Sequence, residues 1–159
     1  MTAPEKPIEA VRGPFVSSVP YRHQRIFAAA IHCSDGRLGE HVDDFLQNGL
    51  ELPRYDRVAC PGGPVALSGR FSAYWETRGV EEQLRFLAHV HEIRRVVLIA
   101  HSDCAYYSRC LEVAPGRMES EQKEDLEKAF WAVQRIIPGI DVERFFARIT
   151  GEEVRFETL

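Results

Sequence analysis

The sequence has little net charge and no stretch of basic residues, and both features argue against a nucleic-acid partner. Its 20 lysine and arginine residues are set against 24 acidic residues, so the formal net charge is −4 at pH 7. The longest basic run is the pair Arg94 and Arg95. Because nucleic-acid binding requires positive side chains that neutralise phosphates, we expect no nucleic-acid partner.

Long apolar runs are also absent. No segment approaches the roughly 18 apolar residues that a membrane-spanning helix needs, and residues 1–18 lack the apolar block of a secretory signal peptide. We therefore expect a cytoplasmic protein without a membrane partner. The remaining composition, 45% hydrophobic and 28% charged over 159 residues, is typical of one globular domain.

Cysteine is scarce as well, with four residues in the whole chain. In a cytosolic protein of this size, four cysteines favour free thiols or metal ligands over a disulfide framework. We interpret Cys60 and Cys110 as small hydrophobic core residues. Cys33 and Cys104 lie in polar motifs, and these motifs are where the question of function begins.

The first 24 residues contain four prolines and little periodicity, so we expect residues 1–24 to form an N-terminal arm and residues 25–159 a single domain. Short apolar runs predict strands, and apolar residues at three- and four-residue spacing predict helices. Strands that alternate with helices predict an α/β fold with a mainly parallel central sheet flanked by helices. We expect strands over 25–31, 55–60 and 95–100, helices over 38–46, 80–92 and 126–137, and a last strand or hairpin over 142–149 and 153–157.

Two polar motifs follow the predicted strands 25–31 and 95–100. The first is Cys33-x-Asp35-x-Arg37, and the second is His101-x-x-Cys104. Ligands of open parallel sheets bind beyond the carboxyl ends of the strands, so both motifs open into one crevice if the two strands are neighbours. Two thiolates and one imidazole with a free fourth position form a known zinc arrangement. We predict one Zn²⁺ per chain, bound by Cys33, His101 and Cys104.

The paired motifs resemble those of the β-class carbonic anhydrases, over roughly residues 25–107. The resemblance implies a zinc enzyme that reversibly hydrates CO₂ to bicarbonate, with Asp35 and Arg37 as its catalytic dyad. It also implies a homodimer or larger homo-oligomer, and a resting state in which Asp35 becomes the fourth zinc ligand. Residues 59–64 replace the Arg-Asn-Ala-Gly sequence usual in the family, and Ala105 replaces a usual glycine.

Other functions remain open at this point. Related zinc hydrolases act on carbonyl sulfide or carbon disulfide, and a catalytically silent zinc protein would carry the same ligands. A metal-free alternative keeps Cys33 as a nucleophile that is activated by Asp35 or His101. Elsewhere, His89 and His91 are two residues apart on a predicted helix and therefore point to different faces. We interpret the charge run from Glu119 to Lys128 as a solvated helix face.

Overall fold

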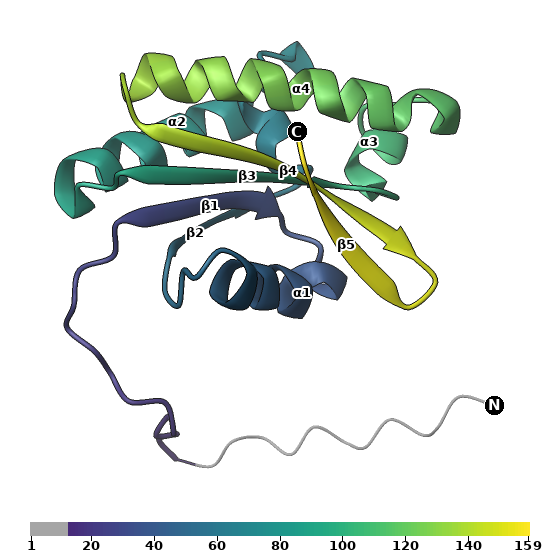
Figure 1. Cartoon of the computed structure of the whole chain (residues 1–159). Helices are drawn as coiled ribbons and strands as arrows, with labels where there is room; N and C mark the ends of the chain where they lie inside the picture. Colours follow the sequence, from purple (N-terminus) through teal and green to yellow (C-terminus); the bar gives the residue numbers. More distant parts are fainter. Residues whose placement is uncertain (1–12) are drawn as a thin grey trace.

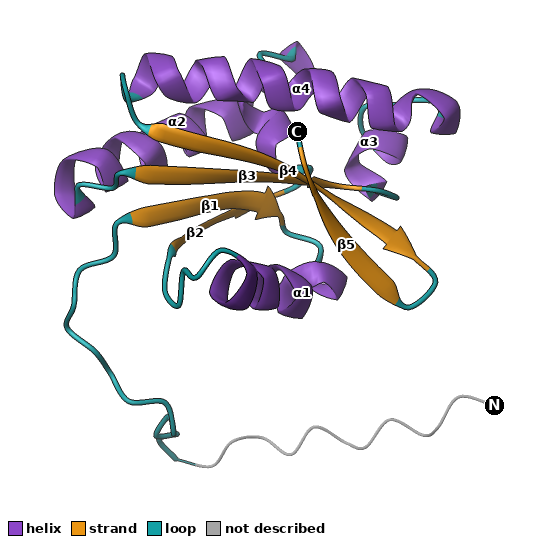
Figure 2. Ribbon diagram, viewed as in Figure 1, coloured by secondary structure: helices purple, strands orange, loops and turns teal. Residues whose placement is uncertain are grey.

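A five-stranded sheet forms the centre of the computed structural model, which describes residues 13–159 (Figures 1 and 2). The strand order is β2-β1-β3-β4-β5, and every pair is parallel except the last, in which β5 returns antiparallel to β4. The structure thus confirms the α/β fold with a mainly parallel sheet and the C-terminal hairpin. The strands are β1 (Ala28–Cys33), β2 (Asp56–Cys60), β3 (Arg95–His101), β4 (Asp141–Thr150) and β5 (Glu153–Thr158).

Helices cover both faces of this sheet. In Figure 1, α2 and α4 lie on one face and α1 on the other. Short 3₁₀ turns follow β1 and β2, at Gly36–Leu38 and Gly63–Leu67, and a third, Phe71–Ala73, precedes α2. Single π-helical turns extend α1 and α2, at Phe45–Gly49 and Leu87–His91. The α-helices are α1 (Gly39–Asp44), α2 (Tyr74–Phe86), α3 (Ala105–Arg109) and α4 (Pro115–Ile136).

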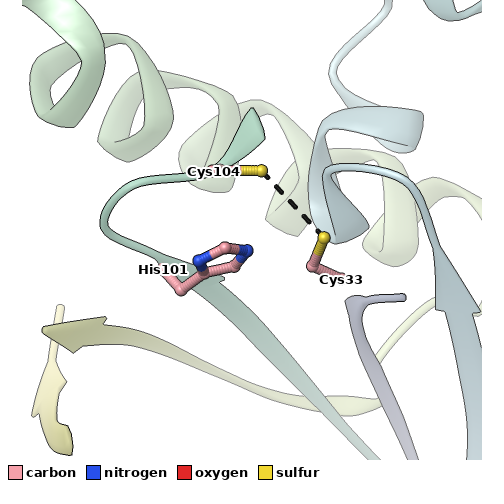
Figure 3. A group of neighbouring side chains, drawn as sticks. All are labelled: Cys33, His101 and Cys104. Atoms are coloured by element: carbon pink, nitrogen blue, oxygen red, sulfur yellow. Dashed lines mark hydrogen bonds between the residues drawn. The ribbon is translucent and has the colours of Figure 1, made fainter. Parts of the chain in front are cut away.

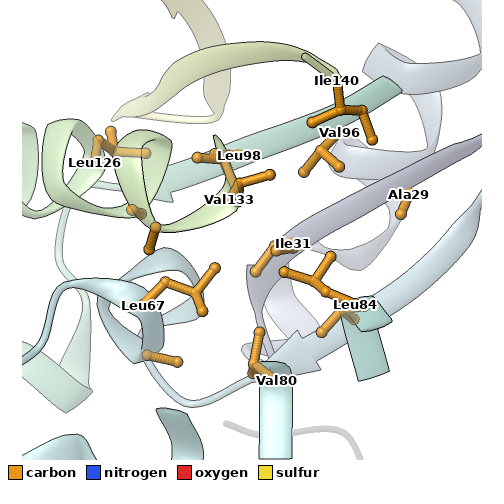
Figure 4. Close-up of a cluster of buried hydrophobic side chains, with 14 of the residues drawn as sticks. Ala29, Ile31, Leu67, Val80, Leu84, Val96, Leu98, Leu126, Val133 and Ile140 are labelled. Atoms are coloured by element: carbon orange, nitrogen blue, oxygen red, sulfur yellow. The ribbon is translucent and has the colours of Figure 1, made fainter. Parts of the chain in front are cut away.

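The strands β1 and β3 are buried on both faces, which explains their continuous apolar sequences. Side chains of a strand alternate between the two faces. Ala29 and Ile31 accordingly join Leu98 in the core beneath α2 and α4, whereas Ala30 joins Val97 in the core beside α1. Figure 4 shows the first core, in which Leu84 of α2 and Leu126 and Val133 of α4 face the sheet. The side chains at the carboxyl ends of β1 and β3 are therefore held by strands that are packed on both faces.

Several predicted boundaries differ from the observed ones. Strand β1 begins at Ala28 instead of residue 25 and extends to Cys33, and β3 extends to His101, so each strand includes the first candidate ligand of its motif. Helix α2 begins at Tyr74 and helix α4 at Pro115, well before the first apolar residues that predicted them. Proline at the first helical position favours such a start, because its missing N–H is not needed there.

The predicted N-terminal arm lies partly outside the described residues. From residue 13 to 24 the chain contains no helix or strand, and its side chains are exposed. The guanidinium of Arg54 donates hydrogen bonds to the backbone carbonyls of Arg22 and Gln24, which connects the end of this segment to the domain. Among the helices described, none has both the length and the apolar character needed to cross a membrane.

We predict that Leu84→Ala lowers the free energy of unfolding by about 2–5 kcal/mol, because it removes a fully buried side chain and leaves a cavity between α2 and the sheet. The control Gln83→Ala, at an exposed side chain of the same helix, is expected to alter it by less than about 0.5 kcal/mol. Chemical denaturation of both variants measures the difference. Equal effects would contradict the assignment of this core.

Candidate metal centre

The two sequence motifs meet at the carboxyl edge of the sheet. Cys33 is the last residue of β1 and His101 is the last residue of β3, and these strands are neighbours with His32 opposite Ile99. Cys104 follows His101 after a tight turn in which Asp103 adopts a left-handed conformation, with φ of 56°. This turn directs the chain back toward β1, and Cys104 precedes the first residue of α3.

The side chains of Cys33, His101 and Cys104 converge (Figure 3). One ligand atom from each residue lies within 4.8 Å of the other two, and the two sulfur atoms are 4.0 Å apart. His101 and Cys104 are each 2% exposed, while Cys33 is partly exposed. The structure therefore brings together all three predicted ligands.

The imidazole of His101 is oriented by its own loop. Its Nδ1 lies 2.7 Å from the backbone carbonyl oxygen of Ser102, so Nδ1 carries the proton and donates it to that carbonyl. The other ring nitrogen, Nε2, is then left with a free lone pair. It is buried and has no hydrogen-bond partner among the described residues. Because buried polar atoms are rarely left unpaired, this nitrogen is available to a metal ion or to a water molecule.

The two thiols form a hydrogen bond with each other. The hydrogen bond from the Cys104 thiol is the largest of the causes that lower the pKa of Cys33 to about 4, and His101 lowers it further although burial opposes the shift. The same hydrogen bond, together with burial, raises the pKa of Cys104. A divalent cation bound between the sulfurs would displace the thiol proton of this hydrogen bond, so metal binding would release a proton.

The donor set of this site fits zinc. Soft thiolates and a neutral imidazole favour Zn²⁺ over Mg²⁺ or Ca²⁺, which prefer oxygen ligands. The buried, unpartnered Nε2 of His101 supplies the lone pair that such an ion requires. Three protein ligands leave a fourth tetrahedral position for an exchangeable group, which is the arrangement of catalytic rather than structural zinc sites.

Asp35 and Arg37 form a tightly bonded pair beside these residues. Arg37 Nε lies 3.0 Å and 3.2 Å from the two carboxylate oxygens of Asp35, and Nη2 lies 2.6 Å from one of them. The hydrogen bond from Arg37 lowers the pKa of Asp35 to about 2. The carboxylate is therefore ionised and held in one orientation, and its side chain is only 17% exposed whereas that of Arg37 is 70% exposed.

A cavity of about 490 Å³ opens at this edge of the sheet. Its lining includes Cys33, the Asp35–Arg37 pair, and the apolar surfaces of Pro61 and Ala105. One candidate ligand, Cys33, and the Asp35–Arg37 ion pair thus border one concave, partly apolar space, while His101 and Cys104 are buried behind it. Such spaces with a few fixed polar groups are the usual form of small-molecule sites.

Two buried polar residues of α4 hold the His101–Tyr107 segment from behind. Gln122 is 1% exposed, and its Nε2 donates a hydrogen bond of 2.7 Å to the backbone carbonyl of His101. Asp125, also 1% exposed, accepts a hydrogen bond of 2.7 Å from the hydroxyl of Tyr107. Arg70 also contacts Asp125, because its Nε lies 2.9 Å from the Asp125 carboxylate. We call Gln122 and Asp125 the α4 anchor.

The α4 anchor corrects one interpretation made from the sequence. The charge run from Glu119 to Lys128 is not only a solvated face, since Gln122 and Asp125 within it are buried. A signal for this was present: Gln122 and Asp125 fall at helical spacing on the same face as Leu126 and Ala129. The interpretation of Cys110 as a core residue is also wrong, because Cys110 is exposed, whereas Cys60 does pack against the core.

Gly63 supports the end of β1. It has φ of 59°, and a Cβ atom built on it would come within 2.7 Å of the Cys33 nitrogen and of the His32 carbonyl carbon. Only glycine allows this close approach between the segment after β2 and the strand that carries Cys33. The turn that begins at Pro61 therefore also supports a candidate ligand.

We predict that Gln122→Met destabilises the protein by about 1–3 kcal/mol, because the change keeps the side-chain volume but leaves the buried carbonyl of His101 without its donor. The control Gln83→Met, on the exposed face of α2, is expected to change stability by less than about 0.5 kcal/mol. Denaturant unfolding of the two variants provides the comparison. A Gln122 variant as stable as the control would show that the anchor does not hold the segment.

We predict that Gly63→Ala destabilises the protein more than Gly69→Ala does. Both glycines have positive φ, 59° and 78°, so both substitutions introduce similar backbone strain. Only at position 63 does the new Cβ meet the backbone of β1, whereas nothing lies within 4 Å at position 69. Thermal unfolding separates the two variants, and melting temperatures lowered equally would remove the proposed support of Cys33.

This chain is similar in sequence to one known protein and in fold to several solved structures. An uncharacterized protein of Rickettsia conorii is 27% identical over 128 residues, which cover 76% of this chain and 67% of that protein. A carbonic anhydrase of Streptococcus mutans has a similar structure, with a TM-score of 0.54, 21% identity, and coverage of 83% of this chain and 81% of that one. A carbon disulfide hydrolase in its apo form gives a TM-score of 0.52 at 10% identity, covering 82% of this chain and 78% of that one.

At these identities the two solved structures share the fold with this chain. The family assignment comes from a sequence model described as "Putative carbonic anhydrase", which matches residues 23–156. The match runs from before β1 into β5 and includes both polar motifs. The chain therefore belongs to this carbonic anhydrase-like family.

Proposed function

We propose that the protein binds one zinc ion through Cys33, His101 and Cys104 and catalyses the reversible hydration of CO₂ to bicarbonate. The observation that carries the proposal is the convergence of two thiols with a buried imidazole nitrogen that has no partner of its own. The family assignment supports the same chemistry. Asp35 and Arg37, beside these ligands, are proposed as the catalytic dyad.

Asp35 and Arg37 have separate roles in the proposed reaction. Zinc, when bound, acts as a Lewis acid that brings the pKa of a coordinated water near neutrality. Asp35 accepts a hydrogen bond from the attacking water and so directs its lone pair toward the carbon of CO₂. Arg37 fixes the position of Asp35 through a two-pronged contact, which keeps the carboxylate ionised and correctly oriented.

The contacts of Asp35 support an open zinc site. Its carboxylate oxygens are engaged by Arg37, and the group of three candidate ligands that the structure brings together does not include it. A fourth position that is free of protein ligands is what distinguishes an enzyme from a closed, catalytically silent zinc protein. The arrangement therefore favours catalysis over a structural role.

Carbonyl sulfide and carbon disulfide are the alternative substrates. They are linear, uncharged molecules like CO₂, and the apolar surfaces of Pro61 and Ala105 would accept any of the three. Stopped-flow measurement of CO₂ hydration between pH 7 and 9, beside an assay for sulfide release from the other two substrates, decides between them. Faster turnover of a sulfur substrate than of CO₂ would overturn the proposed substrate.

We also propose that the protein is a homo-oligomer in the cytoplasm. Phe71 and Trp75 are 94% and 82% exposed, and such large aromatic side chains are commonly buried in subunit contacts. Light scattering after size-exclusion chromatography gives the mass of the assembly. A strictly monomeric protein at micromolar concentration would contradict this part of the proposal.

We predict that Cys33→Ser and Cys104→Ser each reduce the zinc content of the purified protein from about one ion per chain to a small fraction. A hydroxyl is a much weaker zinc ligand than a thiolate. The exposed Cys110 provides the control, since Cys110→Ser is expected to retain zinc. Metal content is measured by plasma mass spectrometry. A wild-type protein that is active without zinc would instead favour Cys33 as a nucleophile.

We predict that Asp35→Asn retains zinc but reduces turnover about 10²-fold, because an amide presents an N–H where the attacking water needs an acceptor and no longer pairs with Arg37 in the same way. The variant's zinc content and its CO₂ hydration rate are measured on the same preparation. Unchanged turnover would remove Asp35 from the mechanism and leave the zinc ligands untouched.

A further inference from the structure

Two guanidinium groups line the cavity beside the candidate metal centre, and they differ in what they contact. Arg37 is committed to Asp35 through its Nε and Nη2 atoms. The guanidinium of Arg109 makes no hydrogen bond or ion pair with any residue between 13 and 159, although Arg109 lines the same cavity. The guanidinium of Arg109 is therefore free to donate hydrogen bonds to a molecule in the cavity.

The charged residues that line the cavity leave Arg109 uncompensated. Asp35 and Arg37 neutralise each other, and the remaining lining residues, among them Pro61, Ala105 and Tyr106, carry no carboxylate. Two thiolates likewise offset the charge of one zinc ion. The net positive charge of the cavity therefore comes from Arg109, in a chain whose formal net charge is −4. A local positive charge inside a concave, partly apolar surface concentrates anions there.

Helix α3, which follows the candidate ligand Cys104, sets the position of Arg109. Helix α3 begins directly after Cys104 and ends at Arg109, so about 7–8 Å of helix separates the two backbones. Arg109 is exposed whereas Cys104 is buried, so Arg109 lies on the solvent side of the cavity. With a volume of about 490 Å³, the cavity has room for a second small molecule beyond the reacting one.

We propose that Arg109 forms an anion subsite at the mouth of this cavity and binds bicarbonate as it leaves or enters. A planar guanidinium matches a planar oxyanion through two parallel hydrogen bonds, which an ammonium group does not reproduce. The inference rests on the proposed function for the identity of the anion. The subsite itself requires only the geometry and charge described above.

The test compares Arg109→Met with Arg135→Met. Both arginines lie in the last turn of a helix and are exposed, but only Arg109 lines the cavity. Zinc-loaded proteins are titrated calorimetrically with bicarbonate at constant ionic strength, and in parallel with nitrate, a planar oxyanion that hydration chemistry does not consume. Zinc content and circular dichroism establish that both variants are loaded and folded.

We expect Arg109→Met to weaken the binding of both anions about tenfold, with Arg109→Lys in between and Arg135→Met equal to wild type. A tenfold change is of the size expected when one charge-assisted contact is lost. Binding within twofold of wild type in Arg109→Met, or equal weakening in Arg135→Met, would overturn the subsite. A wild-type protein that binds nitrate through Arg109 yet hydrates no CO₂ would support the subsite and overturn the proposed function.

Discussion

The parallel pairing of β1 with β3 is the interaction on which the site depends. It brings the carboxyl ends of two strands from distant parts of the chain to one edge, and it sets the register that places Cys33 near His101. A slip of one residue would turn every side chain of a strand to the opposite face of the sheet. The alternating contacts of Ala29, Ala30 and Ile31 with two separate cores prevent such a slip.

The second requirement is a polar link between the apolar core and the reactive edge. The α4 anchor provides it, because α4 packs its apolar face on the sheet and presents Gln122 and Asp125 from that same face to the ligand-bearing segment. Buried polar groups cost free energy unless they are paired. Here Gln122 Nε2 donates to the backbone carbonyl of His101, and Asp125 accepts hydrogen bonds from Tyr107 and Arg70. Stability and site geometry are thus properties of the same few contacts.

Much of this arrangement was predictable from local patterns. The apolar runs of β1 and β3 indicated buried parallel strands, and the two motifs at their ends predicted the convergence of Cys33, His101 and Cys104. Features that depend on contacts between distant residues were not predictable in this way. The close approach of Gly63 to β1 and the partner of Gln122 belong to this class, and α3 is too short to show a helical period.

The separation of the candidate ligands along the chain has a consequence for the order of events during synthesis. Cys33 and Cys104 are 71 residues apart, and no local loop unites them as it does in a zinc finger. A growing chain that has completed β1 therefore exposes one thiol without a binding site. Under the proposed function, all three ligands can hold a zinc ion only once β3 has paired with β1, so metal binding would stabilise the paired strands by mass action.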